Sequence, residues 1–288
     1  MAVRTVTVRL RADISNYTRN MRQASDNTSR LANAGAAAGA TMLAGFAVAA
    51  AAAARFDKAL SNVRAVTGAN AAEMGKLRAA ALEAGKTTSF TATEAANAEA
   101  ELARAGISTA NIIGGALKGA LALAASGQVD LTEAAVVSAQ AMNTFGLAGK
   151  DVTHIADLLA AGANKSAADV HGLAMSMRMG GLLAHQTGLS IEDTVGTLAA
   201  FADHALIGSD AGTSLKVMLQ RLVPQSKEAS AAMDSIGFSA YDSQGQFVGL
   251  SEMAGRMKTS FSKLTPEARN SAMATIFGAD AVRSATIL

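Results

Sequence analysis

Proline is almost absent from this sequence, and its absence constrains the fold more than any other feature. Only Pro224 and Pro266 occur in 288 residues, so no proline interrupts the first 223. Proline breaks helices and alanine favours them, and half of this alanine-rich chain is hydrophobic. The chain has no cysteine, which excludes disulfides, thiolate metal sites and thiol nucleophiles. The sequence therefore predicts a mainly α protein.

Signals for helix ends recur after Gly68. Pairs typical of helix N-termini are Thr91 with Glu94, Asp130 with Glu133, Ser166 with Asp169, and Ser190 with Asp193. Glycines expected to end helices are Gly85, Gly106, Gly127, Gly146, Gly162, Gly188, Gly208 and Gly237. Together these signals predict short glycine-bounded helices at 70–84, 92–105, 108–125, 131–144, 151–162, 167–186, 191–204, 211–222, 227–236, 251–264 and 266–277.

Internal repetition is visible but irregular. The segment after Gly85 resembles the one after Gly162, 77 residues later, and the segment at Leu131 resembles the one at Leu189, 58 residues later. No single period fits both offsets, so we do not expect a regular solenoid.

Two short stretches have strand-like patterns. Val6, Val8 and Leu10 alternate with polar residues, which predicts an isolated strand at 5–10. Residues 238–250 place a turn around Gly245 between short apolar arms, which predicts one small β-hairpin. The hairpin is a candidate partner for the strand.

The N-terminal residues carry an uneven charge. Residues 1–55 contain seven arginines and two acidic residues, whereas the rest of the chain is net negative. We interpret 1–30 as a basic N-terminal arm that contains an amphipathic helix beginning near residue 13. The arm either contacts nucleic acid such as phage DNA, contacts an anionic membrane, or is simply solvated.

The segment 31–55 is an apolar, Ala/Gly-rich stretch and is predicted to start a long helix. No charge occurs between Arg30 and Arg55. Gly35 and Gly39 would allow two helix backbones to approach closely. The larger apolar groups beside them are Met42, Leu43, Phe46 and Val48. These six residues are the candidate oligomer or membrane contact; a flexible linker is the third reading, and Ala and Gly are weak membrane formers.

No catalytic, cofactor-binding or metal-binding arrangement is recognisable. The four histidines are His154, His171, His185 and His204, and none belongs to a metal-binding His-Glu-x-x-His motif. Asp203, His204, Ser209 and Asp210 are close in sequence, but neighbours at one helix end rarely converge into a triad. The sequence therefore predicts a protein that is not an enzyme.

A series of motifs between residues 55 and 285 resembles the core region of phage tail tape measure proteins. The segments that carry the resemblance, in family order, are Phe56–Gly68, Leu82–Ala95, Leu102–Gly106, Ala156–Ala160, Gly188–Thr194, Gly208–Leu215, Ile236–Gly237, Asp242–Gly245 and Phe277–Gly278. Each is weak alone, and the ordered series is specific. The resemblance makes 56–288 a helical tape measure core domain.

This resemblance implies a structural role in the virion. Proteins of the family occupy the tail lumen, template tail length and leave ahead of the DNA, and some help the genome cross the host membrane. The implied partners are the tail tube protein, the tail tip, tail assembly chaperones and further copies of the chain. The long repetitive helical region typical of the family is missing here, so we expect a fragment or a shortened relative. The alternative is a membrane-active, pore-forming helical protein.

Overall fold

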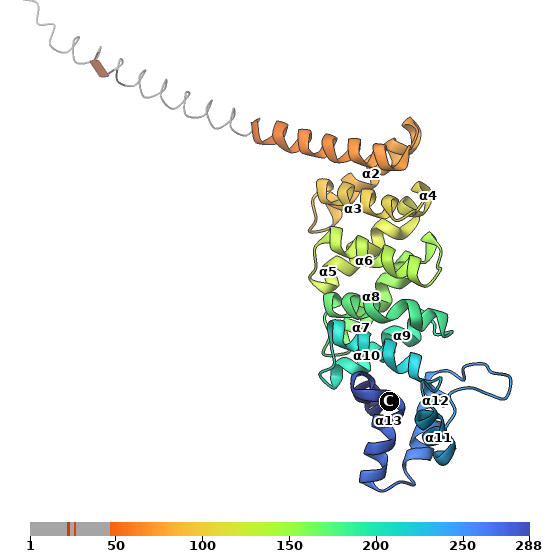
Figure 1. The fold of residues 1–288 in the computed structure, drawn as a ribbon. Helices are drawn as coiled ribbons and strands as arrows, with labels where there is room; N and C mark the ends of the chain where they lie inside the picture. Colours follow the sequence, from red (N-terminus) through yellow and green to blue (C-terminus); the bar gives the residue numbers. More distant parts are fainter. Residues whose placement is uncertain (1–21, 24–25, 27–46) are drawn as a thin grey trace, which may run out of the picture. The chain divides into compact units, whose positions relative to one another are not determined.

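The computed structural model describes residues 22–23, 26 and 47–288 (Figure 1). The chain divides at Arg55 into two units, Met1–Arg55 and Phe56–Leu288. The predicted strand at 5–10 and most of the basic arm at 1–30 lie outside the described residues. So does most of the apolar segment at 31–55, of which 47–55 are helical.

The second unit is built from helices, as expected, and the mainly α prediction is confirmed. Helix 56–67 continues the helical residues at 47–55. The named elements are α2 (Ala71–Thr87), α3 (Ala92–Arg104), α4 (Thr109–Asn111), the π-helical turn η1 (Ile112–Ala116), α5 (Leu117–Gly127), α6 (Leu131–Thr144), the 3₁₀ turn η2 (Gly149–Asp151), α7 (Val152–Asn164), α8 (Val170–Gln186), α9 (Ile191–Asp203), α10 (Gly208–Arg221), α11 (Lys227–Ile236), α12 (Leu250–Phe261) and α13 (Pro266–Ile287).

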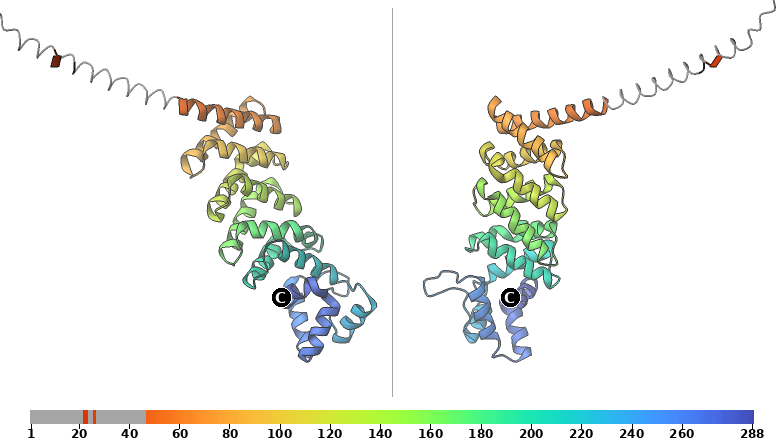
Figure 2. Two further views of the ribbon diagram at one scale, coloured as in Figure 1. Left: turned by 60° about the vertical axis from the view of Figure 1, so that its left-hand side comes forward. Right: turned by 180° about the vertical axis from the view of Figure 1, so that it is seen from behind.

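These helices form a stack of repeated tiers, which corrects the expectation that no regular solenoid exists. In one column α3 packs on α6, α6 on α8, and α8 on α10; in the other α5 packs on α7 and α7 on α9. Both views in Figure 2 show the tiers following one another in chain order. The N-caps of α3, α6 and α8 are Thr91, Asp130 and Asp169, each 39 residues after the one before. The offsets of 77 and 58 residues in the sequence are close to two periods and one and a half.

Polar contacts repeat with nearly the same spacing. The side chains of Asn143 and Thr153 donate to the carbonyls of Ala105 and Gly115, each 38 residues earlier. Two histidine–glutamate pairs, described below, have the same separation. A period of about 38 residues therefore links each tier to the next, the arrangement of repeat proteins in which a unit contacts only its neighbours.

Glycine has two different roles in this stack, and the predicted helix boundaries separate accordingly. Gly106, Gly146, Gly188 and Gly237 adopt left-handed backbone at helix ends. Gly85, Gly127 and Gly162 lie inside α2, α5 and α7, so their assignment as helix stops was wrong. At Gly162 a Cβ atom would lie 2.8 Å from Val195 of α9. These three glycines bring neighbouring backbones together instead of ending helices.

The predicted β-hairpin at 238–250 is wrong as a pair of strands. One antiparallel bridge joins Tyr241 to Phe247, and no strand forms in the described part of the chain. The Asp242 carboxylate organises the loop by accepting bonds from the backbone amides of Gln244 and Gln246. The arms are too short and lack a third strand, and an isolated two-stranded ribbon is at best marginally stable.

Candidate assembly surface and polar sites

The predicted contact segment is only partly described. Gly35, Gly39, Met42, Leu43 and Phe46 lie outside the described residues. Val48, the sixth candidate, is in helical conformation with 71% of its surface exposed. All of residues 47–55 are exposed, and they consist of alanines with Val48 and Arg55. Within the first unit these residues therefore present an exposed, mostly methyl-bearing helix.

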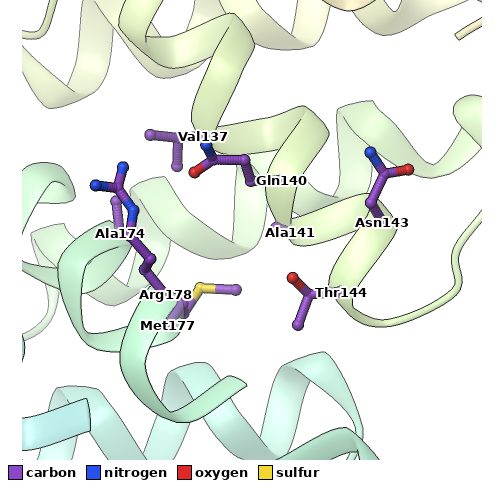
Figure 3. Close-up of a pocket in the computed structure, with 8 residues that line it drawn as sticks. All are labelled: Val137, Gln140, Ala141, Asn143, Thr144, Ala174, Met177 and Arg178. Carbon is purple, nitrogen blue, oxygen red and sulfur yellow. The ribbon is translucent and has the colours of Figure 1, made fainter. Parts of the chain in front are cut away.

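A groove opens between α6 and α8, in two successive tiers (Figure 3). Its volume is about 310 Å³. The eight residues that line it are Val137, Gln140, Ala141, Asn143, Thr144, Ala174, Met177 and Arg178. The charged group among them is Arg178, with neither histidine nor carboxylate beside it. This lining offers hydrogen bonds but no acid–base pair.

A larger and more apolar groove lies between α2, η1 and α5. Its volume is about 620 Å³, and its lining includes Ile113, Leu117 and Leu121, with Glu83 and Lys118 among the charged residues. Ile113 and Leu82 of the same region are large hydrophobic residues with more than a third of their surface exposed. This surface has the character of a packing surface rather than a catalytic site.

Two of the four histidines join consecutive tiers. His154 Nε2 of α7 lies 2.7 Å from Glu192 Oε1 of α9, and His171 Nδ1 of α8 lies 2.6 Å from Glu133 Oε1 of α6. The hydrogen bond to His154 lowers the pKa of Glu192. The hydrogen bond to Glu133 raises the pKa of His171. All four side chains are more than a third exposed, so these pairs connect tiers at the surface.

The remaining histidines have ordinary structural contacts. His185 packs edge-on against Phe145, with ring centroids 5.7 Å apart. His204 Nδ1 lies 3.0 Å from the carbonyl oxygen of Ala200 in the same helix. The carboxylate of Asp203 accepts a bond from the backbone amide of Ala167, which ties it to the loop before α8. The structure gives His204 no hydrogen bond to Asp203, Ser209 or Asp210.

No group of three or more His, Asp or Glu side chains is placed to hold a metal ion, among the residues that the structure describes. Within the same residues, no single helix is long and apolar enough to cross a bilayer. The pair Thr109–Gly127 and Leu131–Thr144 meets those two criteria only when combined across a bend of 117°.

The sequence analysis missed one unusual residue, Glu99 on α3. Its side chain is completely buried, and neither carboxylate oxygen has a hydrogen-bond partner. Burial raises the pKa of Glu99 from 4.5 to about 8. A helical-wheel argument could have found it, because Glu99 lies four residues after Ala95 and three before Leu102, on the buried face.

Comparison with known proteins places this stack among phage proteins. The profile of the phage-related minor tail protein family matches residues 78–278, from α2 to α13. The chain is 34% identical over 223 residues to the tape measure protein of Pneumococcus phage Dp-1, covering 77% of this chain and 19% of that protein. It is 31% identical over 237 residues to the probable tape measure protein of Escherichia phage P2, covering 81% of this chain and 29% of that protein. The chain thus matches less than a third of the length of either relative. No solved structure matches it.

Proposed function

Because this chain belongs to the family of phage-related minor tail proteins, we propose that it serves as tape measure protein in the tail of a phage. Its role is structural: it occupies the tail lumen and takes part in tail assembly, length determination and genome ejection. The observation that carries the proposal is the similarity to two tape measure proteins over about four-fifths of the chain.

The tiered stack is compatible with this role. Each tier contacts the tiers before and after it, so the second unit grows along one direction as repeats are added. Its compact helices rise about 1.5 Å per residue, but they are folded back on one another, so the length of the unit is far less than that of a continuous helix. We therefore assign tail assembly to the 56–288 unit and length measurement to an extended form or to other parts of a longer protein.

Deletion of residues 78–278 in the phage that encodes this chain tests the proposal. We expect virions with filled heads but without tails of normal length, seen by negative-stain electron microscopy. Supplying the intact chain from a plasmid should restore the tails. Normal tails in the deletion strain would refute a structural role in assembly.

For the segment 31–55 we propose that it joins copies of the chain. Gly35 and Gly39 permit close helix approach, and the exposed alanine-rich helix at 47–55 leaves its methyl groups available for burial. Analytical ultracentrifugation of the whole chain, wild type against Gly35→Leu/Gly39→Leu, tests this. Wild type should associate more strongly than the double variant. Equal association, or a wild type that stays monomeric, would refute the proposed contact.

The membrane alternative rests on the same segment, with its apolar groups Met42, Leu43, Phe46 and Val48. Flotation of the whole chain with neutral and anionic liposomes distinguishes insertion from attraction of the basic arm. If the segment inserts, Phe46→Asp should abolish flotation with both kinds of liposome. If only the arm binds, flotation should require anionic lipid and Phe46→Asp should not change it.

A further inference from the structure

A buried polar residue recurs at one position in four successive tiers. Glu99 of α3, Ser138 of α6, Ser176 of α8 and Ser214 of α10 follow one another at 38 or 39 residues, and all are buried. They lie in the column of helices that pack directly on one another. The stack therefore places a polar group at corresponding positions of several junctions between tiers.

In the later tiers this polar group bonds to the next helix. Ser176 Oγ donates to the carbonyl oxygen of Gly208 at 2.7 Å, and Ser214 Oγ donates to that of Asp280 at 2.7 Å. These bonds join α8 to α10 and α10 to α13. At the earlier junction, neither the carboxyl oxygens of Glu99 nor the Ser138 hydroxyl has a hydrogen-bond partner.

We propose that the stack is built to open between α3 and α6, and that the opening is controlled by Glu99, whose carboxyl group can ionise only when the junction admits water. The junction lacks the polar bonds found later in the stack, and it contains unpartnered polar groups that gain hydration when it opens. Because tiers contact mainly their neighbours, α8 to α13 stay packed while α3 separates from α6.

The charges around α3 do not offer Glu99 an alternative partner. Charged side chains on the elements packed against it, and on α3 itself, are Asp57, Lys58, Arg64, Glu73, Lys76, Arg78, Glu83, Lys86, Glu94, Glu101, Arg104, Lys118 and Glu133. All of them are partly or fully exposed. Burial alone raises the pKa of Glu99, to about 8, with no contribution from a neighbouring charge.

This gives the opening a defined pH dependence. In the open form Glu99 has its ordinary pKa of 4.5, whereas in the closed form the pKa is about 8. Between these values the open form releases a proton that the closed form keeps, so the opening equilibrium shifts tenfold per pH unit toward the open form. Below this range and above it, the dependence disappears. The whole shift is on the order of a thousandfold.

Hydrogen exchange measured by mass spectrometry at pH 5, 6, 7, 8 and 9, corrected for intrinsic exchange rates, tests the proposal on the whole chain. In wild type we expect protection of α3 to fall about tenfold per unit up to pH 8 and then level off. Protection of α8 and α10 should stay constant. In Glu99→Gln, protection of α3 should be independent of pH.

Glu83→Gln is the matched control, because it removes an exposed carboxylate from neighbouring α2 and should leave the wild-type profile unchanged. If Glu99→Gln does not fold, Glu99→Leu supplies the same comparison with an apolar side chain of similar size. The proposal is overturned if the variant that lacks the carboxylate keeps the pH dependence, or if wild type loses protection equally in α3, α8 and α10.

Discussion

Small residues allow α8 and α10 to approach closely. A Cβ atom on Gly180 would lie 2.6 Å from the carbonyl oxygen of Gly212, and one on Gly212 would overlap the carbonyl of Ser176 and lie 2.8 Å from the Cβ of Met179. The contact is therefore between backbones, and it has no room for a methyl group. Such glycines look the same in sequence as glycines that end helices. That is why Gly85, Gly127 and Gly162 were misassigned from sequence.

Gly212→Ala tests this close packing. The added methyl meets backbone, which cannot move aside as a flexible side chain can, so the free energy of unfolding should fall by about 1–3 kcal/mol. Gly196→Ala is the control, because Gly196 is inside α9 with open space around it. That change should raise the free energy of unfolding by up to ~1 kcal/mol. Urea denaturation of both variants measures the effects, and similar values for the two would contradict the packing argument.

The exposed pair of His171 and Glu133 should give a pH-dependent contribution to stability. Since the pKa of His171 is raised in the folded state, the contribution is complete below the ordinary histidine pKa of 6.5 and is lost as pH rises through the folded value. The Tm difference between wild type and His171→Gln should therefore be largest near pH 5.5 and vanish by pH 8.5. His204→Gln lacks a carboxylate partner to lose and should show no such trend. A difference that grows with pH would contradict the assignment.

At the scale of helices, sequence signals located most elements because local chemistry decides them. Thr91 and Ser190 form reciprocal capping boxes as predicted, and Asp130 caps α6. The helix expected at 167–186 begins instead at Val170, because Asp169 is the cap and Ser166 bonds back to Gly162. Apolar alternation at 238–250 resembled a hairpin, but Asp242 satisfies the loop amides locally. Competition between side-chain and ladder hydrogen bonds cannot be judged from alternation alone.

Removal of the α6 cap is the prediction for this scale. Asp130 accepts bonds from the backbone amides of Thr132 at 2.7 Å and Glu133 at 3.3 Å. Asp130→Ala leaves both amides without this acceptor and should lower the free energy of unfolding by about 1 kcal/mol. Asp130→Asn keeps the cap and should cost much less. Chemical denaturation checks both, and equal losses would mean that the charge, rather than the cap, stabilises the helix.

At the scale of the whole second unit, the repeat was hidden by its own structure. A tier contains two helices, so similar motifs recur at half-periods as well as full ones, and the helices differ in length. Alanine at most buried positions adds little distinguishing pattern. The spacing of cross-tier contacts at 38 residues, such as that of Asn143 and Ala105, becomes visible only in three dimensions. The contact segment at Gly35–Val48 stays a prediction.

Deletion of one period tests the repeat directly. Removing 131–169 joins Asp130 to Val170, so one cap replaces another and the two columns stay in phase. The shortened chain should remain helical by circular dichroism and unfold cooperatively. Removing 131–150, about half a period, puts the columns out of phase and should give a poorly cooperative, aggregation-prone chain. If both deletions behave alike, the tiers are not interchangeable units.

The 39-residue period also has a mechanical consequence. A chain pulled from its ends through a narrow opening would not have to yield all at once, because each tier is held mainly by the next. Each tier that gives way releases about 130 Å of extended backbone. Single-molecule pulling should therefore show a series of small, evenly spaced force peaks, with the α3–α6 junction yielding first at neutral pH.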